Sequence, residues 1–302
     1  NVMIRKEPLR SLSTSSDIAS NLPDQFRYKS CTSYITRSIM SQQIKFGRKR
    51  LLSGKTVLVT GGSRGIGAAI VRRLGAAKAH VAINYAGNQA AAQKLADEII
   101  ASGGQAFVVQ ADVSSLADIE RMFGACDRAF GGAPNLDILI NNAGVGRSGR
   151  DGTLKGADEQ LFDELFAVNV KGPHFVTQAA LPRLRDGGRI VNIGSMSGKV
   201  GQPFAAGYAM TKRAIQSLTF STALAVAKRQ ITCNCIAPGA VATDFIAALR
   251  EKPGWDEATS KHTPMGRLGE PEDIAGAVMM LLGDDARWVT GQVIEASGGL
   301  SL

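Results

Sequence analysis

A tyrosine and a lysine lie four residues apart in GYAMTK (207–212), a segment of mostly small and apolar residues. In a helix, residues four positions apart lie on the same face, so Tyr208 and Lys212 would meet there. A nearby ammonium favours the phenolate and lowers the pKa of a tyrosine, which is otherwise near 10. The pair is therefore either a solvated surface pair or a proton donor beside the group that adjusts its acidity.

A glycine-rich segment, TGGSRGIG (60–67), lies between a short apolar run and a helical pattern. Glycines at 61, 65 and 67 would allow a tight turn, a close approach of the backbone to a pyrophosphate, and close packing of helix on sheet. The start of the following helix offers unpaired N–H groups to phosphate oxygens. In this strand–helix context the segment predicts a dinucleotide site.

Strands and helices alternate along the rest of the chain. Short β-branched or apolar runs predict strands at 55–60, 80–84, 105–111, 136–141, 189–195, 231–237 and 291–296. Helical periodicity occurs at 66–77, 88–102 and 116–130, over most of 158–185, over about 206–229, and again from 271. Such alternation, with strands apolar on both faces, predicts one doubly wound Rossmann-type α/β domain over 51–302. We expect about seven parallel strands with helices on both faces.

The composition is that of a soluble globular protein, with 44% hydrophobic and 20% charged residues among 302. Residues 1–50 contain ten basic and three acidic side chains, which is +7 of the net charge of +9. The nearly neutral remainder argues against a nucleic-acid-binding protein, and no apolar run reaches the roughly 18–20 residues that span a membrane. The cysteines (Cys31, Cys126, Cys233 and Cys235) have neither disulfide nor zinc spacing, so we expect no metal site.

Residues 1–50 are basic and rich in Ser and Thr, and three interpretations stay open. They could be a targeting peptide, a disordered basic arm, or sequence upstream of a natural start at Met40. Asp17 and Asp24 argue against organellar targeting. We therefore favour an inert segment or a start at Met40, and a cytoplasmic location.

Six motifs occur in an order that resembles the short-chain dehydrogenase/reductase family. They are TGGSRGIG, NNAG (141–144), Asn169 in VNVKG, Ser195 in IGS, the Tyr208-x-x-x-Lys212 pair, and Pro238-Gly239 followed by Thr243. The resemblance extends from about residue 54 to the end of the chain. It implies an oxidoreductase that interconverts a carbonyl and an alcohol with NADP(H).

The resemblance implies a role for each catalytic side chain. Tyr208 would act as general acid in reduction, and Ser195 would hold the carbonyl oxygen. Lys212 would also bind the nicotinamide ribose, and Asn169 would hold a water that relays protons to it. Expected cofactor contacts are Gly61, Ser63, Arg64, Gly65, Ile66, Gly67, Tyr85, Asn88, Asp112, Val113, Asn142, Ala143, Gly144, Tyr208, Lys212, Pro238, Gly239 and Thr243.

The choice of NADP over NAD rests on charge. NAD-binding relatives place a carboxylate at the end of the second strand, where this chain has Tyr85 and no acidic residue before Asp97. A carboxylate there would repel a 2′-phosphate, so its absence permits NADP. Arg64 would pair with that phosphate, and Asn88 would donate a further hydrogen bond.

The substrate is expected to contact Ser195, Tyr208 and Phe245, the last within a mobile lid over 239–269. Among subfamilies the chain is most similar to 3-oxoacyl-[acyl-carrier-protein] reductases. Basic pairs at 183/185 and 228/229 could attract an acidic carrier protein to the site mouth, or could be solvated helix-end charges. A small ketone, sugar, steroid or quinone is the alternative substrate, and a non-catalytic cofactor-binding regulator is a weaker one. Family habit implies a homotetramer.

Overall fold

One parallel sheet of seven strands, in the order β3-β2-β1-β4-β5-β6-β7, organises the computed structural model, which describes residues 52–146, 150 and 152–300. The strands are β1 (Thr56–Val59), β2 (His80–Tyr85), β3 (Gln105–Gln110), β4 (Leu136–Asn141), β5 (Leu184–Ile193), β6 (Thr232–Pro238) and β7 (Val293–Ala296). The predicted fold class is confirmed.

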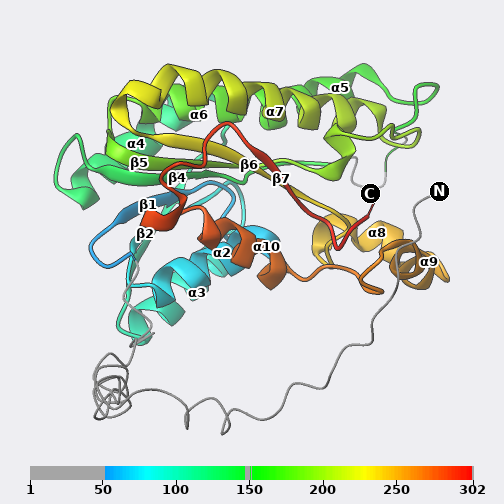
Figure 1. Cartoon of the computed structure of the whole chain (residues 1–302), viewed down its shortest axis with the longest axis horizontal. Helices are drawn as coiled ribbons and strands as arrows, with labels where there is room; N and C mark the ends of the chain where they lie inside the picture. Colours follow the sequence, from blue (N-terminus) through cyan, green and yellow to red (C-terminus); the bar gives the residue numbers. More distant parts are fainter. Residues whose placement is uncertain (1–51, 147–149, 151, 301–302) are drawn as a thin grey trace, which may run out of the picture. The chain divides into compact units, whose positions relative to one another are not determined.

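Helices cover both faces of the sheet (Figure 1). One face carries α2 (Gly65–Ala76), α3 (Gln89–Ala101) and α10 (Pro271–Met280). The other carries α4 (Leu116–Phe130), α5 (Glu159–Phe166), α6 (Gly172–Ala180) and α7 (Ala206–Val226), with a π-helical turn, η2 (Ala167–Lys171), between α5 and α6. Along β1, Val57 and Val59 pack in the first core while Leu58 packs in the second, which explains why the strand is apolar at successive positions.

The strand order places the site. The chain adds β2 and β3 on one side of β1 and then returns to add β4 to β7 on the other side. In such sheets ligands bind beyond the carboxyl ends of the strands, at the point where the order reverses. Here the glycine segment follows β1 and NNAG ends β4, and these two strands are neighbours.

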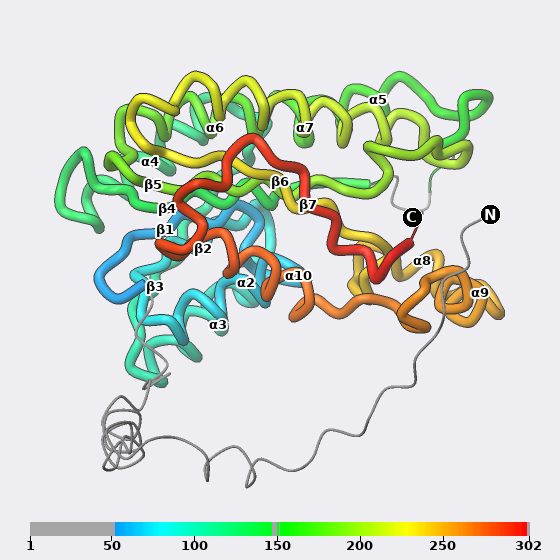
Figure 2. The backbone as a smooth tube through the Cα atoms, viewed as in Figure 1, coloured from blue at the N-terminus to red at the C-terminus, as the bar shows by residue number. Residues whose placement is uncertain are grey.

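The structure differs from the sequence-based expectation in two places that bear on the site. Strand β5 begins at Leu184 rather than 189, and its pairing with β4 shifts register between Leu136 and Ile138. About half of the expected lid at 239–269 is helical: it contains a 3₁₀ turn η5 (Asp244–Ile246), α8 (Ala247–Arg250) and α9 (Trp255–His262). Figure 2 shows α8 and α9 beyond the carboxyl end of β6.

The expectations for residues 1–50, including a start at Met40, lie outside the described residues. Within the described part, Cys126, Cys233 and Cys235 are buried and free. Among the same residues no helix is long and apolar enough to cross a membrane, and no group of three His, Cys, Asp or Glu side chains is placed to hold a metal ion.

Candidate active site

Tyr208 and Lys212 meet on the first turns of α7, as their spacing predicts. The Lys212 Nζ lies 5.6 Å from the centroid of the Tyr208 ring. The lysine side chain is 6% exposed, and its Nζ donates a hydrogen bond of 3.1 Å to the carbonyl oxygen of Ile193, the last residue of β5. The ammonium is thus fixed between the end of the sheet and the phenol.

The acidities of the two side chains are set by burial rather than by their mutual attraction. Burial raises the pKa of Tyr208 to about 12, and a hydrogen bond with Ser195 acts in the opposite direction. Burial lowers the pKa of Lys212 to about 8. Burial, and not the ammonium, therefore dominates the pKa of Tyr208 in this chain. Tyr208 holds its proton at neutral pH, the state that a proton donor requires.

Ser195 follows β5 and caps a short 3₁₀ turn, η3 (Met196–Gly198), by accepting a hydrogen bond of 3.1 Å from the Ser197 N–H. This turn packs tightly on α7, because a Cβ on Gly198 would lie 2.8 Å from the backbone carbonyl of Lys212. Glycine at this position allows the close approach that brings the Ser195 hydroxyl to Tyr208.

Asn169 lies in the π-helical turn η2 and is 1% exposed. Its side chain forms two hydrogen bonds of 2.8 Å with the backbone of Val145, one as acceptor and one as donor. Its Nδ2 also donates to the Thr211 hydroxyl at 3.2 Å. A Cβ on Gly144 would lie 3.3 Å from the Asn169 oxygen and 3.5 Å from the Lys212 Nζ, so both polar groups border this glycine. The expected water relay between them stays a prediction.

The glycine segment forms a cradle closed by NNAG. A Cβ on Gly67 would lie 2.3 Å from the Gly61 carbonyl oxygen, and Gly61 has φ +60°. The Asn142 side chain donates to the carbonyls of Thr60 and Gly61 at 3.0 and 2.9 Å. The Thr60 hydroxyl accepts from the backbone N–H groups of Asn142 and Ala143 at 3.0 and 3.1 Å. Thr60, whose role no sequence motif predicts, therefore joins the two loops.

The start of α2 fits the pyrophosphate of a dinucleotide. Arg64 is its N-cap and forms no side-chain cap, whereas α3, α4 and α5 are capped by Asn88, Ser115 and Asp158. The first turn of α2 also has no acidic residue. Its N–H groups and helix dipole are thus available to an anion.

The residues expected at the 2′-phosphate differ in availability. Arg64 is exposed and has no ion pair within the part of the chain that the structure describes. Asn88 uses its side-chain oxygen to cap α3, accepting from the Ala91 N–H at 3.0 Å, so its amide N–H groups can donate elsewhere. The Tyr85 side chain is 5% exposed and packs in the core, so it offers a ligand little surface.

The residues expected at the adenine ring follow β3. Asp112 is exposed, and one of its carboxylate oxygens accepts from the Ser114 N–H and hydroxyl, both at 2.8 Å. Val113 is buried against Gly172, where a Cβ would lie 2.9 Å from its side chain. Asp112 is therefore the more accessible of the two.

The segment after β6 reaches both the cradle and the phenol. Strand β6 ends at Pro238, and the Gly239 N–H donates to Ala296 at 3.2 Å. The Thr243 side chain lies 3.4 Å from the Cβ position of Gly65, so it borders the cradle. The Phe245 ring lies 5.8 Å from that of Tyr208 and is half-exposed. The expected roles of Thr243 at the cofactor and Phe245 at the substrate stay predictions.

The basic residues expected at the site mouth lie elsewhere in the chain. Arg183 and Arg185 come at the start of β5, and Lys228 and Arg229 follow α7, whereas Tyr208 is near its beginning. Twenty residues of helix span about 30 Å. Arg183, Arg185 and Arg229 form ion pairs of 2.9, 2.7 and 2.8 Å with Asp127, Asp137 and Asp186. Of the two interpretations left open by the sequence, this placement favours charges at helix and strand ends away from the site mouth.

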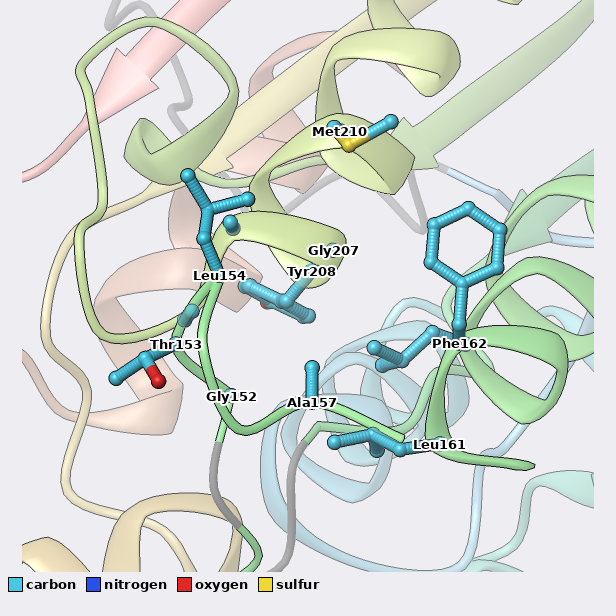
Figure 3. Close-up of a pocket in the computed structure, with 12 residues that line it drawn as sticks. Gly152, Thr153, Leu154, Ala157, Leu161, Phe162, Gly207, Tyr208 and Met210 are labelled. Carbon is cyan, nitrogen blue, oxygen red and sulfur yellow. The ribbon is translucent and has the colours of Figure 1, made fainter. Parts of the chain in front are cut away.

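A cavity beside Tyr208 was not predicted from the sequence. It has a volume of about 190 Å³ and is lined by twelve residues from 152–165 and 205–210 (Figure 3). Figure 3 shows Tyr208 among Leu154, Ala157, Leu161 and Phe162. A signal was present in EQLFDELF, because Leu161 and Leu165 are four residues apart and lie on one face of α5.

Comparisons with known proteins agree with this geometry. Residues 61–301 match the profile of a family described as enoyl-(acyl carrier protein) reductase. A 3-oxoacyl-[acyl-carrier-protein] reductase of Staphylococcus aureus is 38% identical over 248 residues, covering 82% of this chain and 98% of that protein. Versicolorin reductase 1 of Aspergillus parasiticus is 38% identical over 259 residues, covering 82% and 97%. The crystal structure of the angucycline C-6 ketoreductase LanV with bound NADP superposes with a TM-score of 0.78 at 40% identity, covering 83% of this chain and 96% of that one.

Proposed function

Because the chain belongs to the short-chain dehydrogenase/reductase family, we propose that it is an NADPH-dependent ketoreductase that converts a carbonyl to a secondary alcohol. One observation carries this proposal: the Tyr208 hydroxyl interacts with Ser195 and its ring lies 5.6 Å from the Lys212 ammonium, at the carboxyl end of β5, the strand next to β4. This is the arrangement that proton donation to a bound carbonyl requires.

Bound NADPH supplies the hydride that the carbonyl carbon accepts. The side chains of this protein supply the proton and stabilise the charges that develop. Tyr208, protonated at neutral pH, donates its phenolic proton to the carbonyl oxygen. Ser195 donates a hydrogen bond to the same oxygen and stabilises its developing charge. Lys212 stabilises the phenolate that remains, and Asn169 fixes the loop beside the ammonium.

The residues around the cradle fit NADP(H). The uncapped start of α2 would hold the pyrophosphate, and Arg64 with the Asn88 amide would hold the 2′-phosphate. The NADP bound in the LanV structure, at 40% identity, supports the same cofactor for this chain.

Two substrate classes follow from the relatives. A 3-oxoacyl thioester is the class that the sequence favoured, and the Staphylococcus aureus reductase supports it. A free ketone is the second class. Versicolorin reductase 1 and LanV support it, and at 38% and 40% identity they are about as similar to this chain as the Staphylococcus aureus reductase. A carrier protein that docks at the site mouth would need basic residues there, but the pairs at 183/185 and 228/229 lie away from Tyr208. Their position therefore favours the free ketone.

The test is oxidation of NADPH and of NADH by the chain starting at Met40, with acetoacetyl-CoA, crotonyl-CoA and a panel of free ketones. Turnover of a ketone with NADPH, and product identified as the alcohol, would support the proposal. Reduction of crotonyl-CoA alone would contradict it, because that reaction saturates a carbon–carbon bond. Activity on acetoacetyl-CoA but on no free ketone would show that the substrate class is the acyl thioester.

We also propose a cytoplasmic homotetramer with its catalytic domain in 51–302. The exposed groove between η2, α6 and α7, lined by Phe166, Val170, Phe175 and Leu218 among others, supports association through these helices. Light scattering of the purified protein measures the mass, and a monomer would contradict this proposal.

A further inference from the structure

The cavity beside Tyr208 is formed by two segments that the backbone ties together. Gly152 and Ala205 form a parallel bridge, and the Ala206 N–H donates to the Gly152 carbonyl at 3.1 Å. Ala206 begins α7, the helix that carries Tyr208 on its first turn. The position of the cavity relative to the phenol is therefore fixed by main-chain hydrogen bonds.

The lining is apolar, and none of the twelve lining residues is charged. Leu161 and Leu165 are buried in its wall, whereas Leu154 is 87% and Met210 51% exposed at its edge. Exposed apolar side chains gathered around a concave surface mark a binding site. A polar or charged substrate body would lose its hydration here without gaining partners.

The size of the cavity limits what it can accept. Its volume is about 190 Å³, and a dry apolar cavity of about 150 Å³ accepts benzene. Gly152, Ala157 and Gly207 present little more than backbone to this space, which lets a flat group approach closely. One ring, or two fused rings, matches this volume and shape.

The cavity also adjoins the proton donor, since Tyr208 is one of its lining residues. The Tyr208 ring is part of the lining, and its hydroxyl interacts with Ser195. In Figure 3 the Tyr208 ring lies between Leu154 on one side and Leu161 and Phe162 on the other. A ketone whose oxygen meets the phenolic hydroxyl can place its neighbouring ring in this space.

We propose that this cavity binds the apolar body of the substrate, a one- or two-ring group adjoining the ketone, and that Ala157 and Met210 determine specificity by setting its width. The proposal rests on the ketoreductase function proposed above and narrows the substrate class to cyclic or aryl ketones that are not attached to a carrier protein.

The test compares β-tetralone, whose fused rings would fill the cavity, with ethyl acetoacetate, which would leave it empty. In the unaltered protein, kcat/KM with NADPH should favour β-tetralone. Ala157→Leu narrows the cavity, and it should lower the ratio of kcat/KM for β-tetralone to that for ethyl acetoacetate by about tenfold or more, the effect of misplaced methylenes in an apolar pocket. Met210→Ala should also lower this ratio, by removing a wall.

Ala101→Leu is the matched control, since Ala101 is an exposed alanine that ends α3 and does not line the cavity. It should leave both rates unchanged. Thermal melting and NADPH fluorescence show that each variant is folded and binds cofactor. If both ketones are reduced but Ala157→Leu leaves the ratio unchanged, the cavity proposal is wrong while the ketoreductase function stands. If neither ketone nor any other in the panel is reduced, the ketoreductase function itself fails.

Discussion

The Asn169 side chain pairs with the backbone of Val145 as a neighbouring strand would. The Val145 N–H donates to its Oδ1 at 2.8 Å, and its Nδ2 donates to the Val145 carbonyl at 2.8 Å. Val145 follows NNAG, the loop that closes the cofactor cradle. The π-helical turn that holds Asn169 therefore fixes a loop of the site, and π-turns recur at functional sites for this kind of reason.

Asn169→Ala should reduce both stability and turnover. The substitution removes both hydrogen bonds to the partly buried Val145 backbone, at about 0.5–1.5 kcal/mol for each. For a domain of this size, each kcal/mol lowers the melting temperature by about 2–4 °C. Calorimetry and kcat with NADPH measure the two effects. Unchanged melting and unchanged kcat would contradict the pairing as a support of the site.

Thr211→Val should cause a smaller loss of the same kind. The Thr211 hydroxyl accepts from the Asn169 Nδ2 at 3.2 Å and donates to the Tyr208 carbonyl at 2.7 Å, so it links the asparagine to the helix of the phenol. Valine keeps the shape and removes both bonds, at about 1 kcal/mol. Thr211→Ser keeps the hydroxyl and should restore kcat. Equal kcat in the two variants would assign Thr211 to packing alone.

Patterns in the sequence were sufficient for the sheet and for the cradle. Strands such as β1 are continuously apolar because they pack on both faces of the sheet. Glycine is required at position 67 because a Cβ there would collide with the Gly61 carbonyl oxygen. Tyr208 and Lys212 could be paired because helix geometry alone sets residues four apart on one face.

Long-range contacts were not predictable in the same way. The cavity depends on a bridge between Gly152 and Ala205, which are far apart in sequence and carry no pattern. The rise in the pKa of Tyr208 was not predictable from the sequence, because no local spacing reveals how deeply the phenol is buried. The sequence could not decide between a site-mouth role and a remote position for the basic pair Arg183 and Arg185, because it does not reveal at which end of the sheet the pair lies.

Tyr208→Phe should abolish reduction without weakening cofactor binding. The substitution removes only the hydroxyl that donates the proton, and general acid catalysis contributes about 10²–10⁴-fold to rate. We expect kcat to fall by this factor while the NADPH dissociation constant, measured by fluorescence, changes little. Ala209→Gly, on the same helical turn, is a control for disturbance of the helix start. Turnover retained in Tyr208→Phe would refute the proton-donor role.

The rate of reduction should fall as the pH rises through about 8, because burial lowers the pKa of Lys212 to about 8. Below this value the lysine is an ammonium that stabilises the phenolate formed on proton transfer, and above it this charge is lost. Tyr208, with a pKa of about 12, stays protonated across the same range and so does not contribute to the fall in rate. The pH profile of kcat measures this effect. The Lys212→Met variant should have a low kcat that does not fall further above pH 8. If kcat of this variant still falls above pH 8, Lys212 is not the group responsible.

Arg64→Ala should weaken the use of NADPH and leave that of NADH unchanged. Arg64 is exposed beside the start of α2, and a hydrogen bond to a charged group contributes about 1.5–3 kcal/mol, so kcat/KM for NADPH should fall by about 10–100-fold. Asn88→Ser should have a weaker effect of the same sign, since serine keeps the helix cap and loses the amide donor. Arg72→Ala is the matched control, because Arg72 lies on the same helix and pairs with Glu98 at 3.2 Å. A parallel fall in the NADH rate would mean that Arg64 supports the cradle rather than the 2′-phosphate, and an unchanged NADPH rate would remove Arg64 from the cofactor site.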